Sequence, residues 1–342
     1  MTIQPPTHPS PESPKPILRA FLPRLALFLL LLTLCQLLVG HLVPYTPDAG
    51  NPSLLQNSLD QDRPSVLFLG DSVMRFADRS DASGAGIPSL YRKAADYRVE
   101  PILIAQGGMH MDAFRHYAKL AATHPNKPKA VFIEINPAGL TDITHPFLYF
   151  RADSMTIYGM LHPWARPFLH PLAVFRHPMT KPGGSMQDYY RTPVRFRKQV
   201  IGHLHEYGWN NPKYRKITTA HQREKILTRY FCEPKSTNFK IRAIGEIART
   251  LHSADIPAFF YVTPVDLEFC SQYWPGLFAH SIHEKVNVVS AQLEGTDARL
   301  IDMSFDLPHS AFSYADYPNE HLKLVGRGHV AQVLADASKD LF

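Results

Sequence analysis

The sequence lacks several features that would place it quickly in a class of protein. It has only 3 cysteines in 342 residues, no internal repeat and no signature of a nucleic-acid-binding module. Nucleic acid is therefore the weakest explanation for its net charge of +6. His203 and His205 have no cysteine or carboxylate at ligand spacing, so we predict neither a metal site nor a cofactor.

Charged residues are also sparse, and they are unevenly placed. They make up 19% of the chain, whereas the hydrophobic share of 45% can bury a sizeable core. Residues 151–230 hold 14 Lys and Arg against 4 Asp and Glu. Such a basic block suits anionic lipid or an acidic polymer, and the alternative is a solvated surface with no direct role.

The N-terminus predicts a membrane protein. Residues 1–16 contain six prolines and are expected to form a disordered cytoplasmic tail. Residues 17–43 are the predicted transmembrane anchor, because their uncharged part spans roughly 28 Å, close to a hydrocarbon core of about 30 Å. The alternative is a buried helix of a soluble core. The basic residues nearby precede the uncharged part, residues 25–43, which places the rest of the chain on the extracytoplasmic (periplasmic) side of the cytoplasmic membrane; they are Lys15, Arg19 and Arg24.

Two cysteines, Cys232 and Cys270, would then lie in an oxidising compartment. Thiols in such a compartment can pair when their geometry allows it. The sequence alone leaves open whether these two do.

After a linker over residues 44–63, strand and helix patterns alternate through a domain over 64–342. Apolar runs of strand length cover 65–69, 101–105, 130–135, 258–262 and 299–302. Helical spacing covers 112–122, 241–253, 280–293 and 322–341. The alternation predicts an α/β fold, a three-layer α/β/α sandwich around a five-stranded parallel sheet. A helical insertion over about 140–238 interrupts it.

Residues with distinctive chemistry follow successive predicted elements. Ser72 directly follows the first strand, Asn136 the third, and His321 precedes the last helix, while Gly107 and Gly108 follow the second strand. Open α/β sheets bind ligands at the carboxyl ends of their strands, so these positions can converge. A serine needs a histidine base to act as a nucleophile, and its tetrahedral intermediate needs hydrogen-bond donors. Taken alone, Ser72 could instead simply cap a helix.

In this order the chain resembles the SGNH (GDSL-type) hydrolase superfamily over about residues 64–342. The matching blocks are Gly70-Asp71-Ser72-Val73, Gln106-Gly107-Gly108, Glu134-Ile135-Asn136-Pro137, and His321-Leu322 with Gly326. The resemblance implies that Ser72 is the nucleophile and His321 its base. It also implies an oxyanion hole made by the backbone N–H groups of Ser72 and Gly108 with the Asn136 amide, although Gly107 is an alternative donor.

The acid partner of the histidine departs from the superfamily pattern. The resemblance implies an aspartate three residues before His321, but that position is Pro318. Asp316 is the preferred acid, since the residues after it could loop it back toward the imidazole. Glu320 is the alternative, and a dyad without an acid is a third possibility.

The predicted anchor and the run Phe260-Tyr261-Val262-Thr263-Pro264 resemble a narrower group, the membrane-anchored DltD-like and alginate O-acetylation proteins. That resemblance implies acyl transfer onto, or removal from, a cell-envelope polysaccharide or lipid-linked polymer. It also implies a multispanning membrane O-acyltransferase as a partner. Transferase and esterase remain alternatives, and the rival from another class is a non-catalytic scaffold that binds polymer or a partner enzyme.

Overall fold

The structure is a computed structural model, and the residues that it describes are 15–42, 52–61, 63–75, 84–105, 109, 111–140, 230–231, 234, 238–273, 275–313 and 320–342. The chain forms two compact units, one made of Met1–Thr46 with Leu161–Pro178 and one made of the rest. Each unit is described by itself. Most of the predicted insertion lies outside the described residues, as do Gly107, Gly108, Cys232 and Asp316.

In the first unit, the described element is helix α1 (Lys15–Leu42), which has 28 residues and carries Pro23 inside it. It coincides closely with the segment predicted as an anchor, and large apolar side chains such as Phe28 and Leu34 are exposed along it. Within the part of the chain that the structure describes, no helix combines the length and apolarity needed to cross a membrane.

The second unit is built on one five-stranded parallel sheet, which confirms the predicted α/β class. Its strands are β1 (Ser65–Gly70), β2 (Glu100–Ala105), β3 (Ala130–Ile135), β4 (Ala258–Val262) and β5 (Arg299–Asp302), in the order β2-β1-β3-β4-β5. Every residue of β1, β3 and β4 is buried, as expected of parallel strands covered on both faces. The register brings the carboxyl ends of the strands to one edge.

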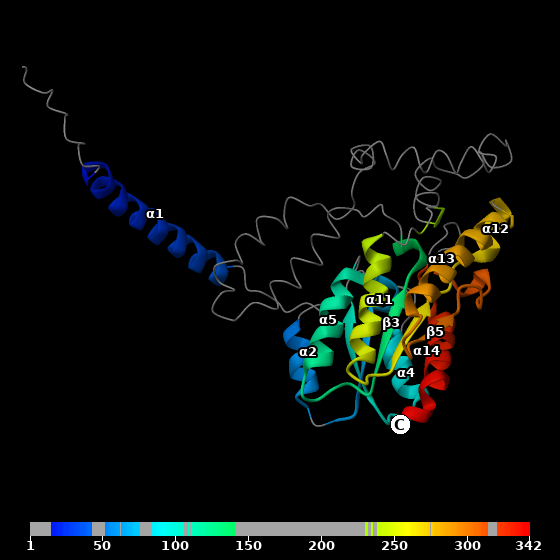
Figure 1. Ribbon diagram of the computed structural model, residues 1–342. Helices are drawn as coiled ribbons and strands as arrows, with labels where there is room; N and C mark the ends of the chain where they lie inside the picture. Colours follow the sequence, from blue (N-terminus) through cyan, green and yellow to red (C-terminus); the bar gives the residue numbers. More distant parts are fainter. Residues whose placement is uncertain are drawn as a thin grey trace, which may run out of the picture. The chain divides into compact units, whose positions relative to one another are not determined.

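Helices cover both faces of this sheet, so the domain has three layers (Figure 1). One face packs against α2 (Pro52–Leu59), α5 (Met111–Thr123), α11 (Phe239–His252) and α13 (Leu277–Leu293) in one apolar cluster. The other face packs against α4 (Ile87–Ala94) and α14 (Leu324–Ser338) in a second cluster. The predicted sandwich is therefore observed.

Most differences from the predicted elements are small and have local causes. The last helix begins at Leu324 rather than 322, because Leu322 instead pairs with Phe312 in an antiparallel bridge. Part of the segment predicted as a linker is the helix α2, whose Leu55 and Leu59 are buried against the sheet. In the described parts of the chain, the short helices α4 and α12 (Leu267–Tyr273) were also not predicted.

Three phenylalanines stack across the centre of the sheet. Phe132 on β3 lies in register with Phe68 and Phe259 on its two neighbouring strands. Its ring centroid is 4.8 Å from that of Phe68 and 5.1 Å from that of Phe259, and all three side chains are buried. The row fills the core on the α4–α14 face.

We expect Phe132→Ala to lower the free energy of unfolding by about 3–5 kcal/mol, because it leaves a cavity between two stacked rings. Urea denaturation followed by circular dichroism would measure the change. The control is Val325→Ala, at a side chain that is 68% exposed, which should change stability by less than about 0.5 kcal/mol. Equal effects of the two substitutions would contradict the packing described here.

Candidate active site

The sheet has a topological switch point at β1. This strand pairs with β2 on one side and with β3 on the other, so the chain winds away from it in both directions. Ligands of open α/β sheets bind outside the carboxyl ends of the strands at such a point. Asp71 and Ser72 directly follow β1, and Asn136 directly follows β3.

The turn after β1 is shaped by Asp71. The backbone N–H of Val73 donates to Asp71 Oδ1 at 2.7 Å, so Asp71 caps the short helix α3 (Ser72–Arg75). Ser72 is the first residue of that helix and is half-buried. The residue that caps this helix is therefore Asp71 and not Ser72, for which capping was the alternative role.

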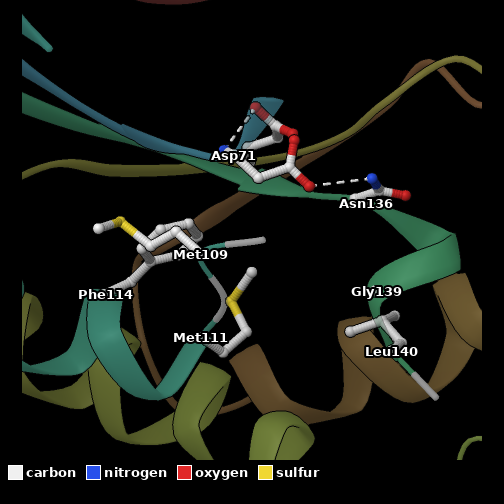
Figure 2. A pocket seen from close by; sticks show the side chains of 8 residues that line it. Asp71, Met109, Met111, Phe114, Asn136, Gly139 and Leu140 are labelled. Carbon is white, nitrogen blue, oxygen red and sulfur yellow. Dashed lines mark hydrogen bonds between the residues drawn. The ribbon is translucent and has the colours of Figure 1, made fainter. Parts of the chain in front are cut away.

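Asn136 joins this turn to the C-terminal part of the chain. Its Nδ2 donates to Asp71 Oδ2 at 3.1 Å and to Glu320 Oε1 at 3.3 Å. Its Oδ1 accepts the backbone N–H of Ala138 at 3.0 Å, which fixes the orientation of the amide. Figure 2 shows the Asn136 and Asp71 side chains joined at the edge of the sheet.

Glu320, the alternative acid, is buried and held by two donors. Besides Asn136, the hydroxyl of Tyr230 donates to Glu320 Oε2 at 2.8 Å. The ammonium group of Lys285 lies 5.9 Å from the centre of the Tyr230 ring and donates to the carbonyl of Pro137 at 3.0 Å. A buried cation thus supports the residues around this carboxylate.

His321 follows Glu320 and is half-buried. Its backbone carbonyl accepts the N–H of Ser313 at 2.9 Å, beside the bridge between Phe312 and Leu322. Since the side chain of Glu320 reaches Asn136, His321 is brought within one residue of a group that contacts the Ser72 turn. Asp71 after β1, Asn136 after β3 and Glu320 in the last loop therefore meet at one edge.

Glu134 is a buried acid at this edge. The sequence placed it in a strand and in one of the motifs but predicted no chemical role for it. Its side chain is 1% exposed, and its Oε2 accepts the N–H of Asp71 at 3.4 Å and the hydroxyl of Tyr261 at 3.5 Å. Within the described part of the chain, Oε1 has no hydrogen-bond partner. Burial, followed by the negative charge of Asp71, raises the pKa of Glu134 well above its ordinary value.

Glycine is required beside this acid. A Cβ atom added at Gly70 would lie 2.6 Å from Glu134 Oε2 and 2.8 Å from Met74 Cβ. Because Gly70 has no side chain, the carboxylate of Glu134 can reach the backbone N–H of Asp71. Packing therefore explains the glycine in the Gly-Asp-Ser run.

A small cavity lies between this polar edge and an apolar wall. Its volume is about 20 Å³, enough to hold a water molecule. Asp71, Glu134 and Asn136 line it on one side, with Gly139 beside them. The apolar lining consists of Met109, Met111, Phe114 and Leu140, and Figure 2 shows these side chains facing the Asp71–Asn136 pair.

The structure leaves parts of the predicted site outside the described residues. Gly108, the predicted second oxyanion donor, its alternative Gly107, and Asp316, the preferred acid, are among them. The Asn136 amide nitrogen is shared by two carboxylates, so donating to an oxyanion would require it to leave one of them. Cys270 is a buried free thiol, and Cys232 lies outside the described residues.

Sequence reasoning missed one carboxylate–histidine pair near this edge. His309 Nδ1 lies 2.6 Å from Asp266 Oδ2. Asp266 lies in the loop after β4 and His309 begins a short 3₁₀ helix after β5, so their spacing carries no recognisable signal. The only available hint was the position of Asp266 shortly after a strand, at the ligand-binding edge. Among the described residues, no group of three or more histidine, cysteine or carboxylate side chains could hold a metal ion.

No family model and no curated protein match this chain. Among solved structures it is similar to a carbohydrate acetylesterase from Sinorhizobium meliloti, with 8% identity and a TM-score of 0.39, over 82% of this chain and 100% of that chain. It is also similar to a carbohydrate acetylesterase family member from the same organism, with 11% identity and a TM-score of 0.36, over 81% and 98%. At such low values, any functional conclusion must come from the site itself.

We expect Glu134→Gln to change how stability depends on pH. Because the pKa of Glu134 is raised in the folded state, its contribution is fully present below the ordinary value of 4.5 and is lost as pH rises toward the raised value. Glutamine is uncharged throughout, so the variant should gain stability over the native protein with rising pH. Urea denaturation at pH about 4 and about 8 would measure this. A stability difference that is the same at both pH values would contradict a raised pKa.

Proposed function

We propose that the protein is a serine-dependent enzyme that moves an acyl group through an acyl-Ser72 intermediate. The acyl group is an acetyl or aminoacyl ester of a cell-envelope polysaccharide or of a lipid-linked polymer. His321 is the base, and the acid that orients it is Asp316 or Glu320.

One observation carries this proposal: the Asn136 amide bonds both the turn that holds Ser72 and the residue before His321. The nucleophile and base candidates are 249 positions apart in the sequence, and this amide draws their segments to one edge of the sheet. The edge lies at the switch point, where ligands of such sheets bind.

The chemistry assigned to these residues is that of a serine nucleophile. The Ser72 hydroxyl attacks the acyl carbonyl and its proton passes to His321, which returns that proton to the departing alcohol. Backbone N–H groups of Ser72 and Gly108 stabilise the oxyanion, with the Asn136 amide as a third donor. A second hydroxyl then attacks the acyl-serine and releases the product.

Water as the second hydroxyl makes the enzyme an esterase, and a sugar or polymer hydroxyl makes it a transferase. We favour transfer to an envelope polymer, with a multispanning membrane O-acyltransferase as partner, on the resemblance given above. The basic surplus in residues 151–230 is compatible with an acidic polymer.

The second candidate is a non-catalytic scaffold that keeps this fold and binds polymer or a partner enzyme. Two observations favour the scaffold. The Asn136 amide nitrogen already donates to two carboxylates, those of Asp71 and Glu320. In addition, Pro318 occupies the position where the resemblance implies an aspartate. The scaffold needs no reactive serine, so serine reactivity separates the two candidates.

We expect a fluorophosphonate probe to label the native protein and not Ser72→Ala. Such probes react only with a serine that a base activates. The control is Ser89→Ala, which removes an exposed hydroxyl on α4 that donates to the carbonyl of Gly86; it should be labelled like the native protein. In-gel fluorescence gives the readout, and circular dichroism checks folding. Folded native protein that takes up no label would favour the scaffold.

Membrane attachment through residues 17–43 stays a prediction from the sequence. If these residues anchor the chain, the full-length protein should stay with membranes in an alkaline carbonate wash. A double variant with Leu29→Arg and Leu31→Arg should be released, because each central charge costs about 2.5–3.5 kcal/mol. Alanine at the same positions is the control and should stay with the membrane. Release of the native chain by the wash would contradict the anchor.

A further inference from the structure

Two acidic side chains meet beside the turn that holds Ser72. Glu134 lies on β3 and is 1% exposed, and Asp71 directly follows β1. Burial, then the charge of Asp71 and a hydrogen bond between the two carboxyl side chains, raise the pKa of Glu134. Two carboxylates in contact repel each other, so such a pair favours a form in which one member keeps its proton.

The contacts of Glu134 are those of a neutral carboxyl group. Its Oε2 accepts two long hydrogen bonds, from the N–H of Asp71 at 3.4 Å and from the hydroxyl of Tyr261 at 3.5 Å. Among the described residues, none bonds Oε1. Hydrogen bonds to an ionised carboxylate are short, about 2.5–2.9 Å, and burying the charge without them is costly. The proton of the pair is therefore on Glu134.

Another buried carboxylate in the chain has the close contacts that Glu134 lacks. Asp266 is 2% exposed, so its burial is nearly that of Glu134. Its Oδ2 lies 2.6 Å from His309 Nδ1, and its Oδ1 accepts the N–H of Phe269 at 3.0 Å. Each oxygen of Asp266 thus has a nitrogen within 3.0 Å, whereas the two donors to Glu134 are at 3.4 and 3.5 Å.

Asp71 has the donors that suit the ionised member of the pair. Its Oδ1 accepts the N–H of Val73 at 2.7 Å, and its Oδ2 accepts Nδ2 of Asn136 at 3.1 Å. A carboxylate has about four lone-pair sites, so Asp71 can also accept the O–H of Glu134. A single negative charge on Asp71 then caps the helix that begins at Ser72 and holds the Asn136 amide.

Loss of the proton from Glu134 would put two negative charges in contact. The described titratable groups that face Glu134 are acids and a phenol: Asp71 after β1, Tyr261 on β4 and Glu320 in the last loop. Burial, then the charges of Glu134 and Asp71, raises the pKa of Tyr261, so its hydroxyl stays neutral. Repulsion between the two carboxylates would move Asp71 away from the donors that it holds.

We propose that Glu134 is a positioning residue that shares a proton with Asp71, and that loss of this proton at alkaline pH switches the site off. This rests on the proposed function, because Asp71 acts on the reaction through the Ser72 turn and the Asn136 amide. Below the transition, the Glu134 O–H donates to Asp71 and holds both in place. Above it, the proton passes to solvent and leaves Glu134 with a charge of its own.

The first test follows hydrolysis of 4-nitrophenyl acetate by the full-length protein from pH about 5 to about 10. The native kcat should fall about tenfold per pH unit beyond the alkaline transition, as for one ionisation. Glu134→Gln should lose this fall and keep most of the native kcat at neutral pH, because its amide is uncharged and still donates to Asp71. Glu134→Leu has no donor and should lower kcat about 100-fold, the lower range for loss of an oxyanion donor.

Glu246→Gln is the matched control. It makes the same substitution at a glutamate on α11 that is 44% exposed and pairs with Arg115 at the surface. Its pH profile should match that of the native protein. The same alkaline behaviour in the native protein and in Glu134→Gln would overturn the inference, and so would an equal loss of kcat in Glu134→Gln and Glu134→Leu.

Infrared spectroscopy tests the shared proton without relying on the reaction. At pH about 7 an ordinary glutamate is ionised. The spectrum of the native protein minus that of Glu134→Gln should instead show the C=O stretch of a protonated carboxyl group, whereas subtracting Glu246→Gln should show carboxylate bands. A carboxylate signal from Glu134 would overturn the inference. If the protonated band is present but no form of the protein hydrolyses the ester, the proposed function fails and takes the switching role with it, while the shared proton stands.

Discussion

The amide group of Asn136 is the contact on which the arrangement of this edge depends. It bonds Asp71 after the first strand and Glu320 before the last helix, so one side chain links three distant parts of the sequence. It can do so because β3 pairs directly with β1, which sets the residues that follow the two strands side by side. Since the amide oxygen is held by Ala138, the nitrogen has one orientation available.

Three acidic side chains lie close together at this edge of the sheet, and bringing them together costs stability. Asn136 links the carboxylates of Asp71 and Glu320, the backbone N–H of Asp71 bonds Glu134, and both glutamates are buried. Burial, followed by the charge of Asp71, raises the pKa of Glu134, which favours its neutral form. Asn136 donates to Asp71 and Glu320, and Tyr230 donates to Glu320. Natural proteins accept such local costs mainly where a site needs them.

The sequence predicted the sheet well, because continuous apolar runs are typical of strands buried on both faces; β3, β4 and β5 have the predicted bounds. It also indicated that Ser72 and Asn136 would share an edge. It offered no means of pairing Asp266 with His309, which follow different strands and meet only through tertiary packing. The sequence offered Glu320 only as the alternative acid for His321, and it carried no sign that this carboxylate would bond Asn136 and Tyr230 from an irregular loop.

The most direct test of the account is a crystal structure of the full-length protein after reaction with a phosphonate ester. The account predicts a phosphorus atom bonded to Ser72 Oγ, with a nitrogen of the His321 ring within about 3.2 Å of a phosphonate or serine oxygen. Phosphorus on another residue, or a His321 ring turned away from Ser72 across the molecule, would contradict it.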